Sequence, residues 1–177
     1  MNIYKRFPTL KQLAPVYSIV VVVIYSWSLL RFFWRLPSLL NYSTAGQIGV
    51  VLSYLITINL LESLSVVFIP VILSLILPQK WFSERFVTKS VLLVLLGLGY
   101  AIFIASHINT EEPFPYVLFQ WAPLVFLLIF VLVLLLDRIP FLTRILEDLS
   151  DRFVVFLFIS VPASVISLIV VLVRNIF

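Results

Sequence analysis

Five long apolar stretches dominate this chain and restrict the folds that it can adopt. A transmembrane helix needs about 20 apolar residues, because each residue rises about 1.5 Å and the hydrocarbon core is about 30 Å thick. The chain is 63% hydrophobic and 11% charged, whereas soluble domains have about 45–50% apolar and about 25% charged residues. We therefore predict an all-α polytopic integral membrane protein, with residues 1–177 forming one transmembrane domain. The bundle of about five spans is expected at residues 16–36, 47–77, 87–106, 117–136 and 153–173.

The second stretch, residues 47–77, is too long for one upright crossing. A helix of its 31 residues would be about 46 Å long. Pro70 lies inside this stretch, lacks a backbone N–H, and its ring clashes with the carbonyl group of Val66. We therefore expect the helix to tilt, to kink at Pro70, or to protrude from the bilayer.

The basic residues predict how the chain is oriented, because Lys and Arg concentrate in the cytoplasmic loops of membrane proteins. Nine of them fall on the side of the N-terminus: Lys5, Arg6, Lys11, Lys80, Arg85, Lys89, Arg138, Arg144 and Arg152. Three fall on the other side: Arg31, Arg35 and Arg174. This distribution predicts a protein of the cell (plasma) membrane, with its N-terminus in the cytoplasm and its C-terminus outside.

A short amphipathic helix is expected between the last two spans, at residues 139–150. Its apolar residues recur at helical spacing and form one face: Leu142, Ile145, Leu146 and Leu149. The pattern is typical of a helix that lies on the cytoplasmic surface of a membrane. Its charged residues, Arg144, Glu147 and Asp148, are spaced for ion pairs within the helix. They make this helix a candidate docking site for a cytoplasmic partner, the alternative being a plain surface linker.

Glu62 is the most unusual residue of the apolar stretches, since it lies near the middle of the second one. A charge at the centre of a span costs about 2.5–3.5 kcal/mol on insertion scales. Asn59 and Ser65 lie three residues before and after it, on the same side of a helix, and Tyr54 projects within about 80° of that direction. This polar stripe is expected to face protein. Either it joins helices, or it forms part of an ion or substrate path.

Arg31 and Arg35 form a second candidate site, on the side that carries few basic residues. They are four residues apart and therefore share one side of a helix end. Two guanidinium groups can bind one phosphate, and a lipid headgroup is the natural anion at that depth. The alternative is that both side chains extend to the membrane surface without a specific ligand.

No recognised catalytic or cofactor motif occurs in the chain, so we predict that it is not an enzyme and needs no cofactor. It contains no cysteine and one histidine. His107 lies near Glu111 and Glu112, but this spacing matches no known set of metal ligands, so no metal site is predicted. No run of basic residues exceeds two, which argues against nucleic acid as a partner.

Three functions therefore remain open, and all three involve the lipid bilayer. The first is a non-enzymatic membrane subunit or scaffold that packs against other membrane proteins in a larger complex. The second is a small carrier or channel whose polar path includes Glu62, Asn59 and Tyr54. The third is a membrane protein that binds an anionic lipid through Arg31 and Arg35.

Overall fold

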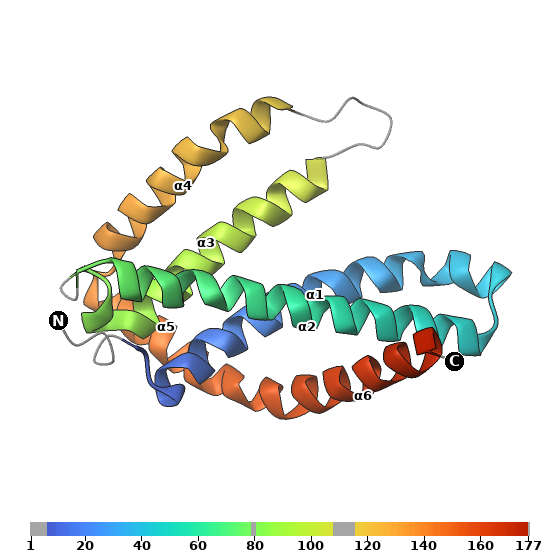
Figure 1. Cartoon of the computed structure of the whole chain (residues 1–177). Helices are drawn as coiled ribbons and strands as arrows, with labels where there is room; N and C mark the ends of the chain where they lie inside the picture. The colour runs from blue at the N-terminus through green and yellow to red at the C-terminus, as the bar shows by residue number, and fades with distance from the viewer. Residues whose placement is uncertain (1–6, 79–80, 108–115, 177) are drawn as a thin grey trace.

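The computed structural model describes residues 7–78, 81–107 and 116–176, and every regular element in these residues is helical. Figure 1 shows the arrangement. The α-helices are α1 (Leu10–Tyr42), α2 (Ala45–Ile76), α3 (Phe86–His107), α4 (Tyr116–Leu136), α5 (Pro140–Phe153) and α6 (Leu157–Ile176). Two short 3₁₀ helices precede α3 and α6, namely η2 (Ser83–Arg85) and η3 (Val154–Phe156). The prediction of an all-helical fold is therefore confirmed for the described residues.

Four segments of the described chain are long and apolar enough to cross a membrane, whereas we expected about five. They are Leu10–Tyr42, Ala45–Ile76, Ser83–Ser106 and Pro140–Ile176. The expected span that is missing from these four is the one at residues 117–136, which lies in α4. Its described apolar part, Gln120–Leu136, counts only as a shorter apolar helix. The whole of α4 has 21 residues, which at about 1.5 Å per residue is close to the thickness of a hydrocarbon core of about 30 Å.

The first two helices are much longer than the hydrocarbon core of a membrane is thick. α1 has 33 residues and α2 has 32, so each is roughly 50 Å long. We expected the first span to end near residue 36, yet α1 continues through Pro37 to Tyr42. Only Ser43 and Thr44 separate it from α2, which itself runs through Pro70 as one helix. Hydrogen bonds between Thr44 and Gln47 cap the start of α2 and stabilise this tight reversal.

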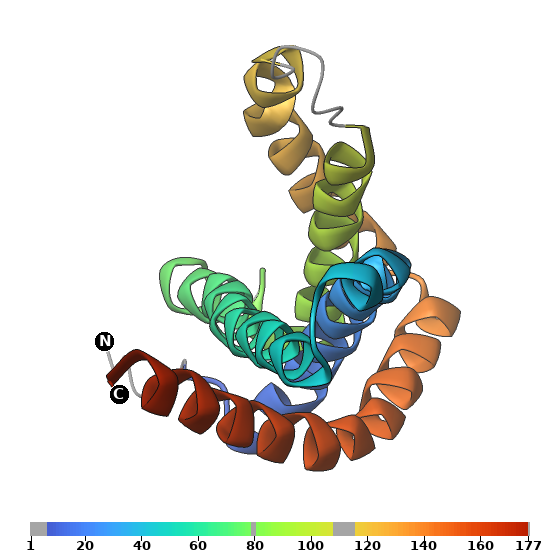
Figure 2. The ribbon, with the colours of Figure 1, turned by 90° about the vertical axis from the view of Figure 1, so that its right-hand side faces the viewer.

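α1 is the central helix of the molecule. It packs against α2, α3 and α5, while α6 packs along α2 and α4 packs along α3. The buried apolar core lies around the N-terminal half of α1 and the start of α3, and it includes Val16, Ile19, Val20 and Val91. Figure 2 shows that the α3–α4 pair projects away from the layer formed by α1, α2 and α6. The opposite ends of α1 therefore have different surroundings: a packed end beside α5, and an open end near the Ser43–Thr44 reversal.

The helix expected at residues 139–150 forms α5, with Pro140 in its first turn, where a missing N–H is tolerated. Of its predicted apolar face, Leu146 is buried and Leu142 packs partly against the core. Ile145 and Leu149 remain exposed. α5 thus lies against α1 and α3, and half of its apolar face is free to contact a membrane surface.

Candidate functional site

A cavity of about 570 Å³ lies between α1, α2 and α3 and is open on one side. α1 contributes Trp27 and Ser28, and α2 contributes Glu62 and Ser65. The remaining lining residues are apolar: Val23, Ile24, Leu61, Val66, Leu98, Ala101, Ile102 and Ala105. A few polar groups in an otherwise apolar hollow are typical of a binding site for an amphiphilic or apolar molecule.

A second cavity of about 220 Å³ continues the first one towards the α5 end of the molecule. The two share the lining residues Val66, Leu98 and Ala101. α2 and α3 run antiparallel here, because the lining of α2 advances from Leu61 to Pro70 while that of α3 goes back from Ala105 to Leu93. We call the combined hollow the α2–α3 trough. Twelve helical steps separate the ends of its α3 wall, which makes it about 18 Å long.

The wall of the second cavity is almost entirely apolar. Besides the shared residues, it is formed by Ile69, Pro70, Leu93, Val94, Gly97, Phe126 and Ile129. Phe126 and Ile129 come from α4, so the α3–α4 pair forms one side of the trough. Polarity therefore falls along the trough, from its Glu62 end to its Pro70 end.

Arg31 and Arg35 lie immediately beyond the Glu62 end of the trough. They line a separate hollow of about 370 Å³ together with Trp34. The guanidinium carbon of Arg31 is 5.3 Å from the centroid of the Trp27 ring, a cation–π distance. Trp27 also lines the trough, so the basic pair begins one helical turn, about 6 Å, from the trough wall.

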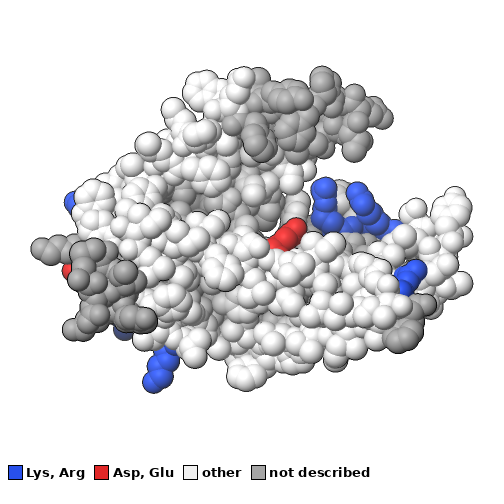
Figure 3. All heavy atoms as spheres, in the orientation of Figure 1, with Lys and Arg blue, Asp and Glu red and all other residues white. Residues whose placement is uncertain are grey.

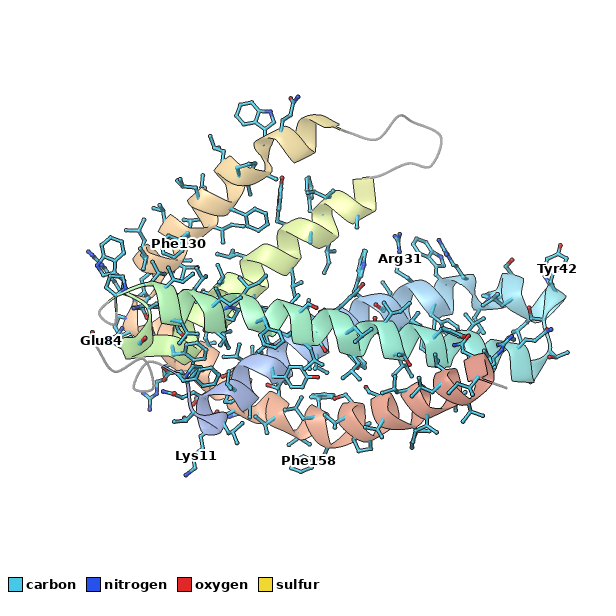
Figure 4. All side chains as sticks on the ribbon, in the orientation of Figure 1. Lys11, Arg31, Tyr42, Glu84, Phe130 and Phe158 are labelled. Carbon is cyan, nitrogen blue, oxygen red and sulfur yellow. The ribbon has the colours of Figure 1, made fainter. Side chains whose placement is uncertain are left out.

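Neither arginine is neutralised within the described part of the chain. Both side chains are exposed, and the ion pairs of the described residues involve only Arg85, Lys89 and Asp137. Figure 3 shows acidic atoms at the edge of a hollow, with basic atoms next to them towards the Ser43–Thr44 reversal. Figure 4 shows Arg31 on the side of α1 that faces the α3–α4 pair. The basic pair is therefore available to bind an anion.

Glu62 is exposed in the trough and has no hydrogen-bond or ion-pair partner among the described residues. Its neighbour Ser65 donates its hydroxyl hydrogen bond to the carbonyl oxygen of Leu61, at 2.8 Å. An ion pair between Glu62 and Arg31 does not form at 4 Å or less. The carboxylate is thus free to bind a donor from outside the helix.

The predicted polar stripe on α2 divides among three neighbours. Asn59 is 2% exposed and accepts a hydrogen bond from the Ser28 hydroxyl group of α1, at 2.8 Å. Tyr54 donates a hydrogen bond of 3.1 Å to the amide oxygen of Asn175 in α6. Only Glu62 and Ser65 line the trough. These residues therefore point in different directions around α2: Asn59 towards α1, Tyr54 towards α6, and Glu62 into the trough.

Several hydrogen bonds between helices were not anticipated from the sequence. Tyr25 in α1 lies 2.7 Å from the Ser164 hydroxyl group of α6, and Tyr17 lies 3.3 Å from that of Ser63 in α2. The Ser18 hydroxyl group also reaches the carbonyl oxygen of Ser150, at 3.1 Å. The only signal in the sequence was the recurrence of small polar residues in apolar helices, which is common at contacts between membrane helices.

A buried ion pair at the α5 end was also missed. The Lys89 ammonium group lies 3.4 Å from a carboxylate oxygen of Asp137, and these side chains are only 6% and 11% exposed. Arg85 donates a hydrogen bond of 2.8 Å to the carbonyl oxygen of Asp137. The sequence analysis counted Lys89 and Arg85 among the basic residues that predict orientation, whereas their contacts with Asp137 join the start of α3 to the end of α4.

The three candidate docking residues of α5 have different surroundings. Glu147 accepts a hydrogen bond of 2.7 Å from the hydroxyl group of Thr88 in α3, so it helps to hold α5 in place. Arg144 and Asp148 are exposed. No ion pair of 4 Å or less forms within α5 in the described structure. Glu147 is exposed as well, so a partner could reach all three residues, but Glu147 already accepts the hydrogen bond from Thr88.

No group of three or more potential metal ligands occurs among the described residues. The side chains of His107, Glu111 and Glu112 lie outside the part of the chain that the structure describes. No protein-family model matches the chain, and no curated protein or solved structure matches it either.

Proposed function

We propose that this protein is a non-enzymatic integral membrane protein that binds an anionic lipid. The phosphate of the headgroup lies against Arg31 and Arg35, and an apolar chain of the lipid extends into the α2–α3 trough. The observation that carries the proposal is the position of two unpaired arginines directly beyond the polar end of an elongated apolar hollow.

The basic pair suits a phosphate group. A guanidinium group donates hydrogen bonds from a planar fork that matches phosphate oxygens, and its charge persists at every physiological pH. Arg31 and Arg35 are four residues apart on α1 and border one hollow, so both can contact the same ligand. Trp27 restrains Arg31 on the trough side by the cation–π contact. The pair is therefore oriented towards a ligand that also occupies the trough.

The trough suits a hydrocarbon chain better than a water-soluble anion. Its lining is apolar beyond Ser65, and its second part has no charged residue. Burying apolar surface there stabilises a bound chain by about 25 cal/mol for each Å² removed from water. The order of chemical groups along the site, from basic to apolar, matches the order along a phospholipid.

The distribution of basic residues supports one orientation of the protein in the membrane. We propose that it lies in the plasma membrane with its N-terminus and α5 at the cytoplasmic side, as the distribution of basic residues predicts. Arg31 and Arg35 then contact headgroups of the outer leaflet, near the turn at Ser43 and Thr44. Half of the apolar face of α5 is exposed where a helix lying on the inner surface would contact lipid.

The proposal is tested by measuring which lipids remain bound after purification in mild detergent. We expect an anionic phospholipid to remain bound to the wild-type protein in native mass spectra, and the double variant Arg31→Gln/Arg35→Gln to lose it. Arg174→Gln is the matched control, because it removes a basic residue from α6 outside the basic pair. Equal lipid retention by the wild type and the double variant would refute the proposal.

A membrane subunit is a second candidate function, and the placement of α4 supports it. α4 packs along α3, and most of its described large side chains outside the trough are exposed: Trp121, Leu124, Leu127, Leu128, Val131 and Leu135. Either lipid or a partner helix could cover this face. A polypeptide that co-purifies in mild detergent, and is lost when Leu124 and Leu128 are replaced by Gln, would favour the subunit.

The carrier alternative has weaker support from the geometry. Of the three residues assigned to its path, only Glu62 lines the trough, since Asn59 binds Ser28 and Tyr54 binds Asn175. A carrier would show flux across proteoliposomes that Glu62→Gln abolishes. The same preparation serves for the lipid-binding assay, so the two functions can be compared directly.

A further inference from the structure

Glu62 has a position in the site that the binding of a plain phosphate does not explain. It lines the trough at its arginine end, together with Trp27. Arg31 follows Trp27 by one turn of α1, so the basic pair lies about 6 Å further along that helix. The carboxylate therefore lies between the basic pair and the apolar part of the trough. A lipid bound as proposed would place there the atoms that join its phosphate to its chain.

A carboxylate at that point favours one kind of chemical group and disfavours another. It repels a phosphate, so the phosphate is held on the arginine side. It stabilises a hydrogen-bond donor, because an ionised acceptor forms hydrogen bonds of roughly twice the strength of neutral ones. Within the described chain no side chain or backbone group donates to Glu62. A donor on the ligand would satisfy it.

We propose that the ligand is a phospholipid with a free hydroxyl or amine group between its phosphate and its hydrocarbon chain, and that Glu62 accepts a hydrogen bond from that group. This inference rests on the proposed function, since it describes the same site. It makes Glu62 a specificity-determining residue. A phospholipid with a single hydrocarbon chain has a free hydroxyl or amine group between its phosphate and its chain. In a lipid whose hydroxyl group there is esterified by a second acyl chain, this hydrogen-bond donor is absent.

The test compares three single-chain phosphate monoesters with the same chain. One carries a hydroxyl group next to the phosphate-bearing carbon, one carries an amine there, and one carries neither. We expect the purified wild-type protein to bind a donor-bearing probe about tenfold more tightly than the plain alkyl phosphate, as one hydrogen bond to a charged group gives. The tighter of the two donor-bearing probes identifies the natural donor.

The variant Glu62→Met removes the acceptor while keeping a side chain of similar length. It is expected to abolish the preference, so that the variant binds the three probes with equal affinity; a preference kept by the variant would contradict the role of Glu62. Glu84→Met makes the same substitution at an exposed carboxylate in η2, outside the trough; it is the matched control and is expected to keep the preference.

Two outcomes separate failure of this inference from failure of the proposed function. If the wild type binds all three probes equally, and Arg31→Gln/Arg35→Gln weakens all three, the inference about Glu62 is wrong and phosphate binding stands. If the arginine variant binds every probe as the wild type does, the proposed function is wrong as well. The comparison of the three probes uses the wild-type protein. It therefore tests the inference even if Glu62→Met does not fold.

Discussion

The guanidinium group of Arg31 lies over the indole ring of Trp27, one helical turn away, with 5.3 Å between the guanidinium carbon and the ring centroid. Trp27 thus lines the α2–α3 trough with one part of its surface and holds a basic residue with another. This contact connects the two halves of the proposed site. The apolar hollow and the basic pair are therefore expected to act together.

Replacing Trp27 with Leu is predicted to weaken binding of an anionic lipid about two- to fivefold. An exposed cation–π contact contributes about 0.5–1 kcal/mol, and its loss lets Arg31 adopt other directions. Titration of the purified protein with an alkyl phosphate measures the change. Trp81→Leu, at the other end of the molecule, serves as the control; an equal loss in both variants would contradict the assigned role.

Filling the trough is predicted to prevent lipid binding without destabilising the fold. Ala101 lines both parts of the trough, so Ala101→Phe places a ring where the chain of the lipid would lie. Lipid retention in native mass spectra is expected to fall to the level of the double arginine variant. Ala122→Phe adds the same ring to α4 outside the trough lining, and it should retain lipid. Full retention in Ala101→Phe would show that the lipid lies elsewhere.

Breaking the Lys89–Asp137 ion pair is predicted to destabilise the α5 end strongly. Removing one partner of a buried pair leaves an uncompensated charge and costs about 3–5 kcal/mol. Asp137→Asn is therefore expected to lower the melting temperature in detergent. The double variant Lys89→Met/Asp137→Leu should be less affected, because no buried charge remains. Arg138→Gln is the control, since Arg138 is exposed beside the pair.

Removing the hydrogen bond between Tyr25 and Ser164 is predicted to destabilise the protein less. This bond joins α1 to α6, with 2.7 Å between the two hydroxyl oxygens. Hydrogen bonds between membrane helices contribute on average about 0.6 kcal/mol, with a maximum of about 1.7 kcal/mol. A double-mutant cycle with Tyr25→Phe and Ser164→Ala measures the coupling energy. A coupling energy of zero would mean that the two hydroxyl groups do not interact in the folded protein.

The apolar stretches predicted most of the helices. Residues 87–106 and 139–150 were expected to be helical and correspond to α3 and α5. The bounds of the first span were less accurate: we expected residues 16–36, yet α1 begins at Leu10 and continues through Pro37 to Tyr42. The backbone hydrogen bonds of a helix join residues four apart and do not depend on the polarity of the side chains. A helix can therefore continue beyond the apolar residues that mark the membrane span.

The candidate site was predicted only in its separate parts. Glu62 was identified because a carboxylate is costly in an apolar span, and Arg31 and Arg35 because they share a helix face. Their proximity could not be derived, since it depends on how α1, α2 and α3 pack. Lys89 and Asp137 were missed for the same reason: each one looked like an ordinary charge at a helix end, and only packing brings them within 3.4 Å.

The sequence alone determined that the described chain is helical and that most of its surface is apolar, because both follow from local hydrogen bonding and from the composition of each stretch. The tertiary structure decided which side chains share a cavity. α3 diverges from α2 and leaves the trough between them, whereas Asn59, only three residues from Glu62, is buried against α1. The direction of each side chain depends on the rotation and packing of whole helices, and a single apolar sequence is compatible with many such arrangements.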